Sequence, residues 1–154
     1  MRQAGVTLIE LLIVVALVGL IAGISFPAVS AGLESIRLTS ASDSLVSFFN
    51  GALNRAERRQ QVIEISIPAK ENVVWLYSTE PGFVRKLELP DGITIRAVWP
   101  KLPLESDEPR RFLVMPGSTV PRFGVEIANR RGARRLVRVD PITGVPQIEP
   151  VEAE

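Results

Sequence analysis

The chain has 154 residues, with 18 basic and 17 acidic side chains, a formal net charge of +1, and neither cysteine nor histidine. Near-neutral charge gives no general case for nucleic-acid binding, and the missing cysteines exclude a disulfide framework and thiol chemistry. Histidine is the commonest general base and metal ligand, and the sequence also lacks a phosphate-binding loop, a dinucleotide fingerprint and a nucleophile elbow. We therefore expect a protein that is not an enzyme and that holds no cofactor and no metal.

An apolar run occupies residues 6–24 and is interrupted only by Thr7 and Glu10. As a helix rising about 1.5 Å per residue, it is nearly long enough to cross a hydrocarbon core of roughly 30 Å. Arg2 precedes the run, so the positive-inside tendency places the N-terminus in the cytoplasm and the rest of the chain outside.

Glu10 is the one charged side chain within this run. A carboxylate in an apolar span is costly, so Glu10 marks a partner site where a cation of another chain would compensate it. The alternative is a lone acid near the membrane interface, protonated or reaching toward water. Ala22, Gly23 and Ser25 also leave an ordinary signal peptide open, although an acid near the start of the run does not suit one.

Apolar residues then recur at three- and four-residue spacing, which predicts an amphipathic helix. They are Val29, Leu33, Ile36, Leu45, Phe48 or Phe49, Ala52 and Ala56. One helix is expected from about Thr7 to Arg59, bent at Pro27 and irregular in its periodicity over residues 39–42. The alternative is an anchor and a separate helix, joined by a flexible link near Pro27 and Gly32.

The second half of the chain alternates between apolar and polar residues over short segments separated by turn residues, which predicts antiparallel strands. The expected strands are residues 62–67, 73–77, 84–89, 93–99, 111–115, 124–128, 136–139 and 145–148. Residues 100–109 are expected as a loop and the acidic tail, residues 149–154, as frayed. One long helix followed by many short strands indicates an α+β fold, with the sheet on the amphipathic face of the helix.

Two groups of side chains have a structural and a binding interpretation. The arginine cluster, defined as Arg130, Arg131, Arg134, Arg135 and Arg138, could contact phosphates. Because no aromatic residues interleave with it, a solvated hairpin whose arginines pair with Glu126 or Asp140 is the favoured interpretation. Trp75, Tyr77, Trp99 and Phe112 are expected in the core or on a sheet face and not as a ligand platform.

The N-terminal residues GVTLIE, from Gly5 to Glu10, followed by LLIVVALVGLIAGISFPA, resemble the class III signal of type IV pilins and type II secretion pseudopilins. The resemblance implies that a prepilin peptidase cuts between Gly5 and Val6 and methylates the new N-terminus at Val6. Glu10 then becomes the fifth mature residue, where the family keeps its glutamate, and it can pair with the Val6 amine of a neighbouring subunit. Val6 stands where the family usually has phenylalanine or methionine.

Residues 53–67 and 112–144 resemble, more narrowly, the H-type minor pseudopilin of type II secretion and the related fimbrial-T minor pilins. The resemblance implies a pilin-like α+β fold, in which a long N-terminal helix with a transmembrane first half packs on an antiparallel sheet domain. The expected segments are a leader at 1–5, a transmembrane and filament-core helix at 6–26, an amphipathic helix at 27–60 and a β domain at 61–154.

This resemblance implies a structural minor subunit of the type II secretion pseudopilus, which supports protein secretion across the outer membrane. The expected partners are other pilins or pseudopilins in a hetero-oligomeric filament, the prepilin peptidase and the bacterial inner membrane, crossed once with the C-terminal domain in the periplasm. One alternative is a minor pilin of a type IV pilus that binds DNA during uptake. Another is a signal-anchored periplasmic enzyme, which the missing histidine and cysteine disfavour.

Overall fold

The computed structural model describes residues 7–102 and 108–151, without the side chains of residues 24–31. The chain divides into two compact units, Met1–Leu33 and Glu34–Glu154. In chain order the elements are α1 (Leu8–Arg59), β1 (Ile63–Ile67), η1 (Ala69–Glu71), β2 (Val73–Ser78), β3 (Val84–Glu88), β4 (Ile93–Trp99), β5 (Arg110–Val114), β6 (Phe123–Asn129), β7 (Arg134–Val139) and β8 (Pro146–Val151). The predicted α+β fold is confirmed.

Helix α1 has the predicted extent, and both of its ends are capped. At its start the Glu10 backbone N–H donates to Thr7 Oγ1 at 3.3 Å, which satisfies one of the free donors of the first turn. At its end Gln60 adopts a positive φ of 52°, and the Gln61 N–H bonds back to the Ala56 carbonyl at 3.2 Å. This is the Schellman arrangement, which stops the helix and turns the chain toward β1.

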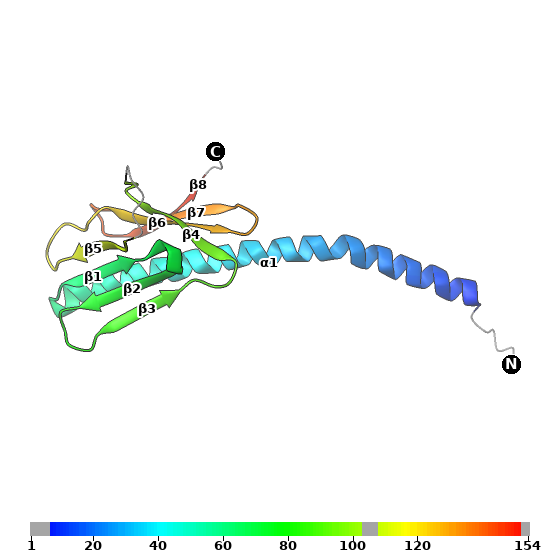
Figure 1. Cartoon of the computed structure of the whole chain (residues 1–154), viewed down its shortest axis with the longest axis horizontal. Coiled ribbons are helices and arrows are strands. Elements are labelled where there is room, and N and C mark those ends of the chain that lie inside the picture. The colour runs from blue at the N-terminus through cyan, green and yellow to red at the C-terminus, as the bar shows by residue number, and fades with distance from the viewer. Residues whose placement is uncertain (1–6, 103–107, 152–154) are drawn as a thin grey trace. The chain divides into compact units, whose positions relative to one another are not determined.

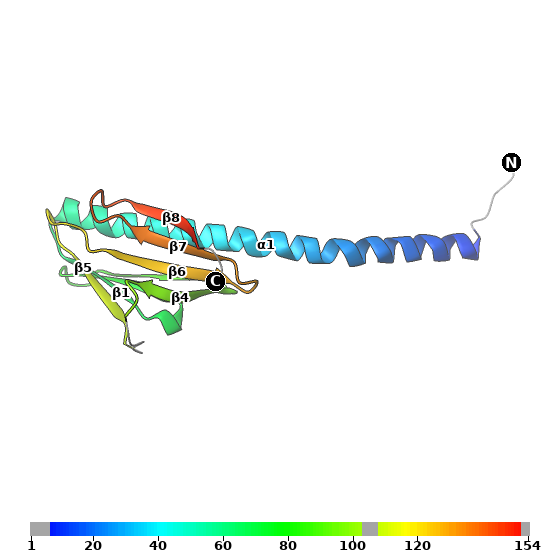
Figure 2. The same ribbon diagram turned by 90° about the horizontal axis from the view of Figure 1, so that it is seen from above.

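The β region contains two four-stranded antiparallel sheets, which the sequence pattern did not divide. Sheet A has the strand order β3-β2-β1-β5 and sheet B the order β4-β6-β7-β8. Figures 1 and 2 show both sheets beside the C-terminal part of α1, which belongs to the same compact unit. Each sheet can therefore bury one face against the helix and leave the other outward.

The tail prediction was wrong for its first residues. Glu149, Pro150 and Val151 belong to β8, whose backbone pairs with β7 through Leu136 opposite Glu149. Strand β8 is an edge strand, where the missing N–H of a proline is tolerated, so Pro150 does not end it. The rest of the predicted tail lies outside the described residues.

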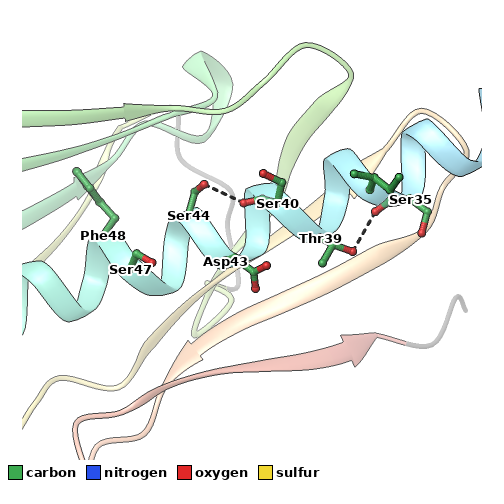
Figure 3. Close-up of a pocket in the computed structure, with 8 residues that line it drawn as sticks. Ser35, Thr39, Ser40, Asp43, Ser44, Ser47 and Phe48 are labelled. Atoms are coloured by element: carbon green, nitrogen blue, oxygen red, sulfur yellow. Dashed lines mark hydrogen bonds between the residues drawn. The ribbon is translucent and has the colours of Figure 1, made fainter.

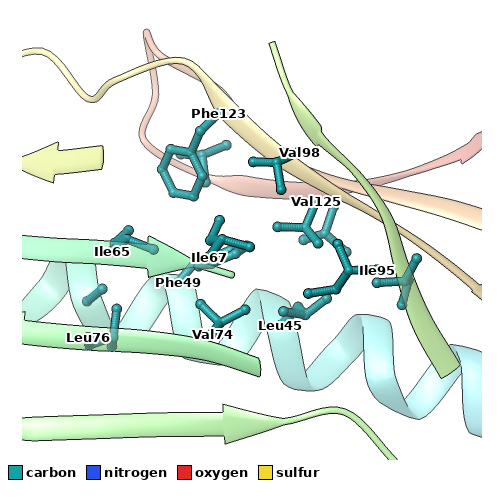
Figure 4. Close-up of a cluster of buried hydrophobic side chains, with 14 of the residues drawn as sticks. Leu45, Phe49, Ile65, Ile67, Val74, Leu76, Ile95, Val98, Phe123 and Val125 are labelled. Carbon is teal, nitrogen blue, oxygen red and sulfur yellow. The ribbon is translucent and has the colours of Figure 1, made fainter. Parts of the chain in front are cut away.

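The hydrophobic core joins α1 to both sheets (Figure 4). Phe49 of α1 is fully buried and meets Phe123 of β6 edge-on, with 5.1 Å between ring centroids, and Phe112 of β5 stacks on Phe123 at 5.0 Å. Such aromatic contacts add to the burial of apolar surface. Other fully buried side chains include Leu45, Ile63, Ile65, Ile67, Val74, Val125, Ile127, Val137 and Val139.

The predicted buried face of α1 was wrong at its beginning. Leu33 and Ile36 are 51% and 65% exposed, whereas Leu38 and Ala41 are buried. At 3.6 residues per turn, Ile36 projects roughly opposite to Leu38, so the apolar pattern changes sides of the helix near residues 36–42. The irregular periodicity there marks the start of the face that the sheets cover.

Replacing Phe49 with alanine should lower the free energy of unfolding by about 3–5 kcal/mol, since it leaves a cavity between the helix and Phe123. Leu113→Ala on the exposed face of sheet A is the control and should change it by no more than about 0.5 kcal/mol. Chemical denaturation of the full chain in detergent, followed by circular dichroism, measures both. Equal effects of the two substitutions would contradict this assignment of the core.

Candidate functional site

The first turns of α1 form a helix whose described surface is apolar on every side. Large hydrophobic side chains from Leu8 to Ile21 are between 53% and 82% exposed in the isolated chain. A soluble monomer rarely exposes such a continuous apolar surface, so these side chains need lipid or protein around them. Among the described residues, no stretch of helix meets the length and hydropathy requirements for a membrane span.

Glu10 lies in the first turn of this apolar helix and is exposed. Its backbone is held by Thr7, and a negative side chain there suits the positive end of the helix dipole. The Glu10 carboxylate is thus exposed in the first turn of α1, among the exposed apolar side chains that follow it. The predicted cleavage residues Gly5 and Val6 lie outside the described residues.

The arginine cluster is dispersed by the geometry of the β6–β7 hairpin. Arg130 and Arg131 lie in its turn, and the other three lie on β7, where alternation points Arg135 away from Arg134. A β-carbon built on Gly92 would lie 3.1 Å from Arg130 Nε, which places Arg130 against the turn before β4. The five arginines therefore do not share one surface.

Two arginines of the cluster already have carboxylate partners. Arg134 Nη1 lies 3.6 Å from Glu126 Oε1, and Arg138 Nη2 lies 2.5 Å from Glu149 Oε1. The sequence predicted Glu126 as an acceptor for this cluster but missed Glu149, because it did not extend β8 far enough to bring Glu149 beside β7. Since the Glu126 side chain is only 4% exposed, its ion pair with Arg134 is part of the folded sheet.

The β7–β8 turn is built around Asp140. Its Oδ1 accepts the N–H groups of Ile142 at 2.7 Å and Thr143 at 3.3 Å. These bonds, the Ile142 bond foremost, lower the pKa of the Asp140 carboxyl from its usual 3.8, and the nearby charge of Arg138 acts in the same direction. The turn holds Ile142 outward with 92% of its surface exposed.

An open groove follows the side of α1 and has a volume of about 820 Å³ (Figure 3). Its lining is Ser35, Ile36, Thr39, Ser40, Asp43, Ser44, Ser47 and Phe48. The Thr39 hydroxyl donates to the Ser35 carbonyl at 3.0 Å, and the Ser44 hydroxyl donates to the Ser40 carbonyl at 2.8 Å. The small side chains of this lining permit close approach of another helix, and its described residues offer no nucleophile–base arrangement for catalysis.

Comparison with known proteins identifies the N-terminal segment. Residues 1–26 match the family model described as the prokaryotic N-terminal methylation motif. This match supports a type IV pilin-like protein, and it does not distinguish a secretion pseudopilin from a pilus subunit. No curated protein and no solved structure matches the chain.

The pKa shift of Asp140 predicts how the β7–β8 turn depends on pH. A carboxyl whose pKa is lowered in the folded state adds stability above its unfolded pKa of 3.8, and this stability is lost as the pH falls through the lower folded value. Asp140→Asn keeps the acceptor oxygen but removes the charge, so the variant should be slightly less stable than the native chain at neutral pH. Denaturation across a pH series should show the difference vanish in acid, and a difference that persists there would refute the linkage.

Proposed function

We propose that this chain is a structural minor subunit of a periplasmic filament of the type IV pilin-like kind, and that its filament is the pseudopilus of type II secretion. The observation that carries the proposal is the methylation motif at residues 1–26, which contains the first turns of α1, where the large apolar side chains from Leu8 to Ile21 are exposed around the single acid Glu10. A helix of this kind can reside in a bilayer before assembly and in a helical bundle afterwards, because both surround it with apolar groups.

Processing would create the charge that assembly needs. A prepilin peptidase would cleave between Gly5 and Val6 and methylate Val6, leaving a cationic amine at the new N-terminus. In the filament this amine would face Glu10 of a neighbouring subunit. Because an unpaired charge in an apolar bundle is costly, the pair fixes the axial stagger between adjacent helices. The filament would therefore accept a subunit only in one register.

The proposed location follows from the same segment. The N-terminus would stay in the cytoplasm and the apolar helix would cross the bacterial inner membrane once, leaving the Glu34–Glu154 unit in the periplasm. Other pilins or pseudopilins would then be its partners in the fibre. The protein would act as a structural part, with the chemistry of cleavage and methylation performed on it by the peptidase.

The type II secretion system is favoured over a DNA-uptake pilus by the arrangement of the arginine cluster. DNA binding needs several cations directed at one phosphate backbone, and its affinity grows with the number of phosphates neutralised. Here Arg134 and Arg138 are paired with carboxylates, and Arg135 points to the other face of β7. Deleting the gene should make exported proteins accumulate in the periplasm, whereas a loss of DNA uptake with normal secretion would assign the protein to the pilus.

Glu10→Gln should reduce incorporation into the filament by about tenfold or more, which corresponds to losing roughly 1.4 kcal/mol of pairing free energy. The substitution keeps the size of the side chain and removes the charge that meets the Val6 amine. Incorporation is measured as the amount of the subunit in sheared or cross-linked filaments, relative to the amount in the membrane.

Glu88→Gln, on the exposed strand β3, is the matched control and should assemble normally. Mass spectrometry of the same samples should find a methylated N-terminus at Val6 in both variants, which separates an assembly defect from a processing defect. Normal incorporation of the Glu10→Gln variant would rule out the charge pair as the basis of the stagger.

A further inference from the structure

The outward face of sheet A carries a groove along its second inner strand, β1. In this sheet β1 lies between β2 and β5, as the strand labels in Figure 1 also show. Ser66 of β1 forms the floor, with Trp75 of β2 opposite it on one side and Arg111 of β5 on the other. The groove has a volume of about 420 Å³, within the range of small-ligand sites.

One wall of this groove is aromatic. The rings of Trp75 and Tyr77 are nearly parallel, with 12° between their planes and 6.1 Å between their centroids. Tyr77 is 38% exposed, and Trp75 is half-buried. Large rings are usually covered by the core or by a partner, so an aromatic pair on the solvent side of a sheet offers a preformed contact surface.

The remaining lining supplies hydrogen-bonding groups of both kinds. Glu64 and Glu71 are acceptors, Arg111 is a donor and the Ser66 hydroxyl is both. Arg111 Nε lies 3.7 Å from Glu64 Oε1, which is too long for a hydrogen bond, so both groups keep capacity for a ligand. The groove therefore combines hydrogen-bonding groups on one side with an apolar aromatic wall on the other.

Several ligand classes fit this groove poorly. A polyanion would meet two carboxylates, Glu64 and Glu71, against the single guanidinium of Arg111. An extended peptide could not add to the sheet here, because the backbone of β1 is already paired with β2 and β5 on both sides. An apolar helix would leave the carboxylates and Arg111 without water or partners.

We infer that this groove is a binding site for a neutral oligosaccharide. A pyranose ring has a face of C–H bonds that packs on aromatic rings, and a rim of hydroxyls that both donate and accept hydrogen bonds. Strands β2 and β5 are two strand spacings apart, roughly 9.6 Å between backbones, so that the aromatic wall and Arg111 stand on opposite sides of the floor formed by β1. The aromatic pair thus serves as a ligand platform, contrary to the expectation from sequence. The inference is independent of the proposed filament role.

The test uses the full chain in a detergent without a sugar headgroup. Trp99→Phe leaves Trp75 as the only indole, since the sequence has two tryptophans. Titration with chitotetraose, cellotetraose and maltotetraose should give a saturable change in Trp75 emission with at least one of them. In the same background Tyr77→Ala and Arg111→Gln should each weaken that binding about tenfold or more, the factor expected for losing one good contact.

Arg85→Gln is the matched control, because Arg85 is an exposed arginine on β3 of the same sheet but lies outside the groove. It should bind like the Trp99→Phe chain, and far-UV circular dichroism should show that every variant is folded. The inference fails if none of the three sugars alters Trp75 emission at millimolar concentration. It also fails if Tyr77→Ala and Arg111→Gln bind as well as the control.

Discussion

The burial of one face of α1, from Leu38 to Ala56, is the contact on which the folded unit depends. Phe49 and Leu45 on this face are fully covered, and Phe123 of sheet B closes over Phe49. Each sheet has an apolar face that must be removed from water, and the helix provides the common surface for both. The core therefore combines contacts between the helix and both sheets with a direct contact between the sheets, Phe112 on Phe123, and neither sheet could bury its inner face by itself.

The exposure of the apolar side chains of α1 differs between the two parts of the helix. Before Leu38 its described large apolar side chains are exposed, and beyond it one side is covered while the other carries hydroxyls and Asp43. The covered side accounts for the fold of the Glu34–Glu154 unit without any side chain from the first turns. Substitutions in the apolar segment can consequently alter insertion or assembly while the core stays intact. This separation suits the role proposed above, in which the apolar segment would pass from a bilayer into a filament while the Glu34–Glu154 unit stays folded.

Local patterns were sufficient to predict the elements but not their partners. Helix α1 and every strand were located to within a few residues, because apolar residues recur about every 3.6 residues along a helix and every second residue along a strand. The division into two sheets was missed, since which strands pair is decided by long-range packing. The end of β8 was missed for the same reason: Glu149 looks like part of an acidic tail until β7 lies beside it. The buried face of α1 was misplaced at Ile36, where the apolar pattern changes sides.

The candidate sites also differ in whether the sequence alone could identify them. Glu10 could be singled out from sequence, because a lone charge in an apolar run is informative without any partner in view. The arginine cluster could not be interpreted in this way. Five arginines close in sequence suggest one basic surface, but strand alternation and the acceptors Glu126 and Glu149 separate them.

For Trp75 and Tyr77 the reverse holds. The sequence did not suggest a binding site there, and the two rings become a candidate site only because β5 places Arg111 across β1 from them. The neighbours of a charged or aromatic side chain on a strand are thus set by the strand that lies opposite it.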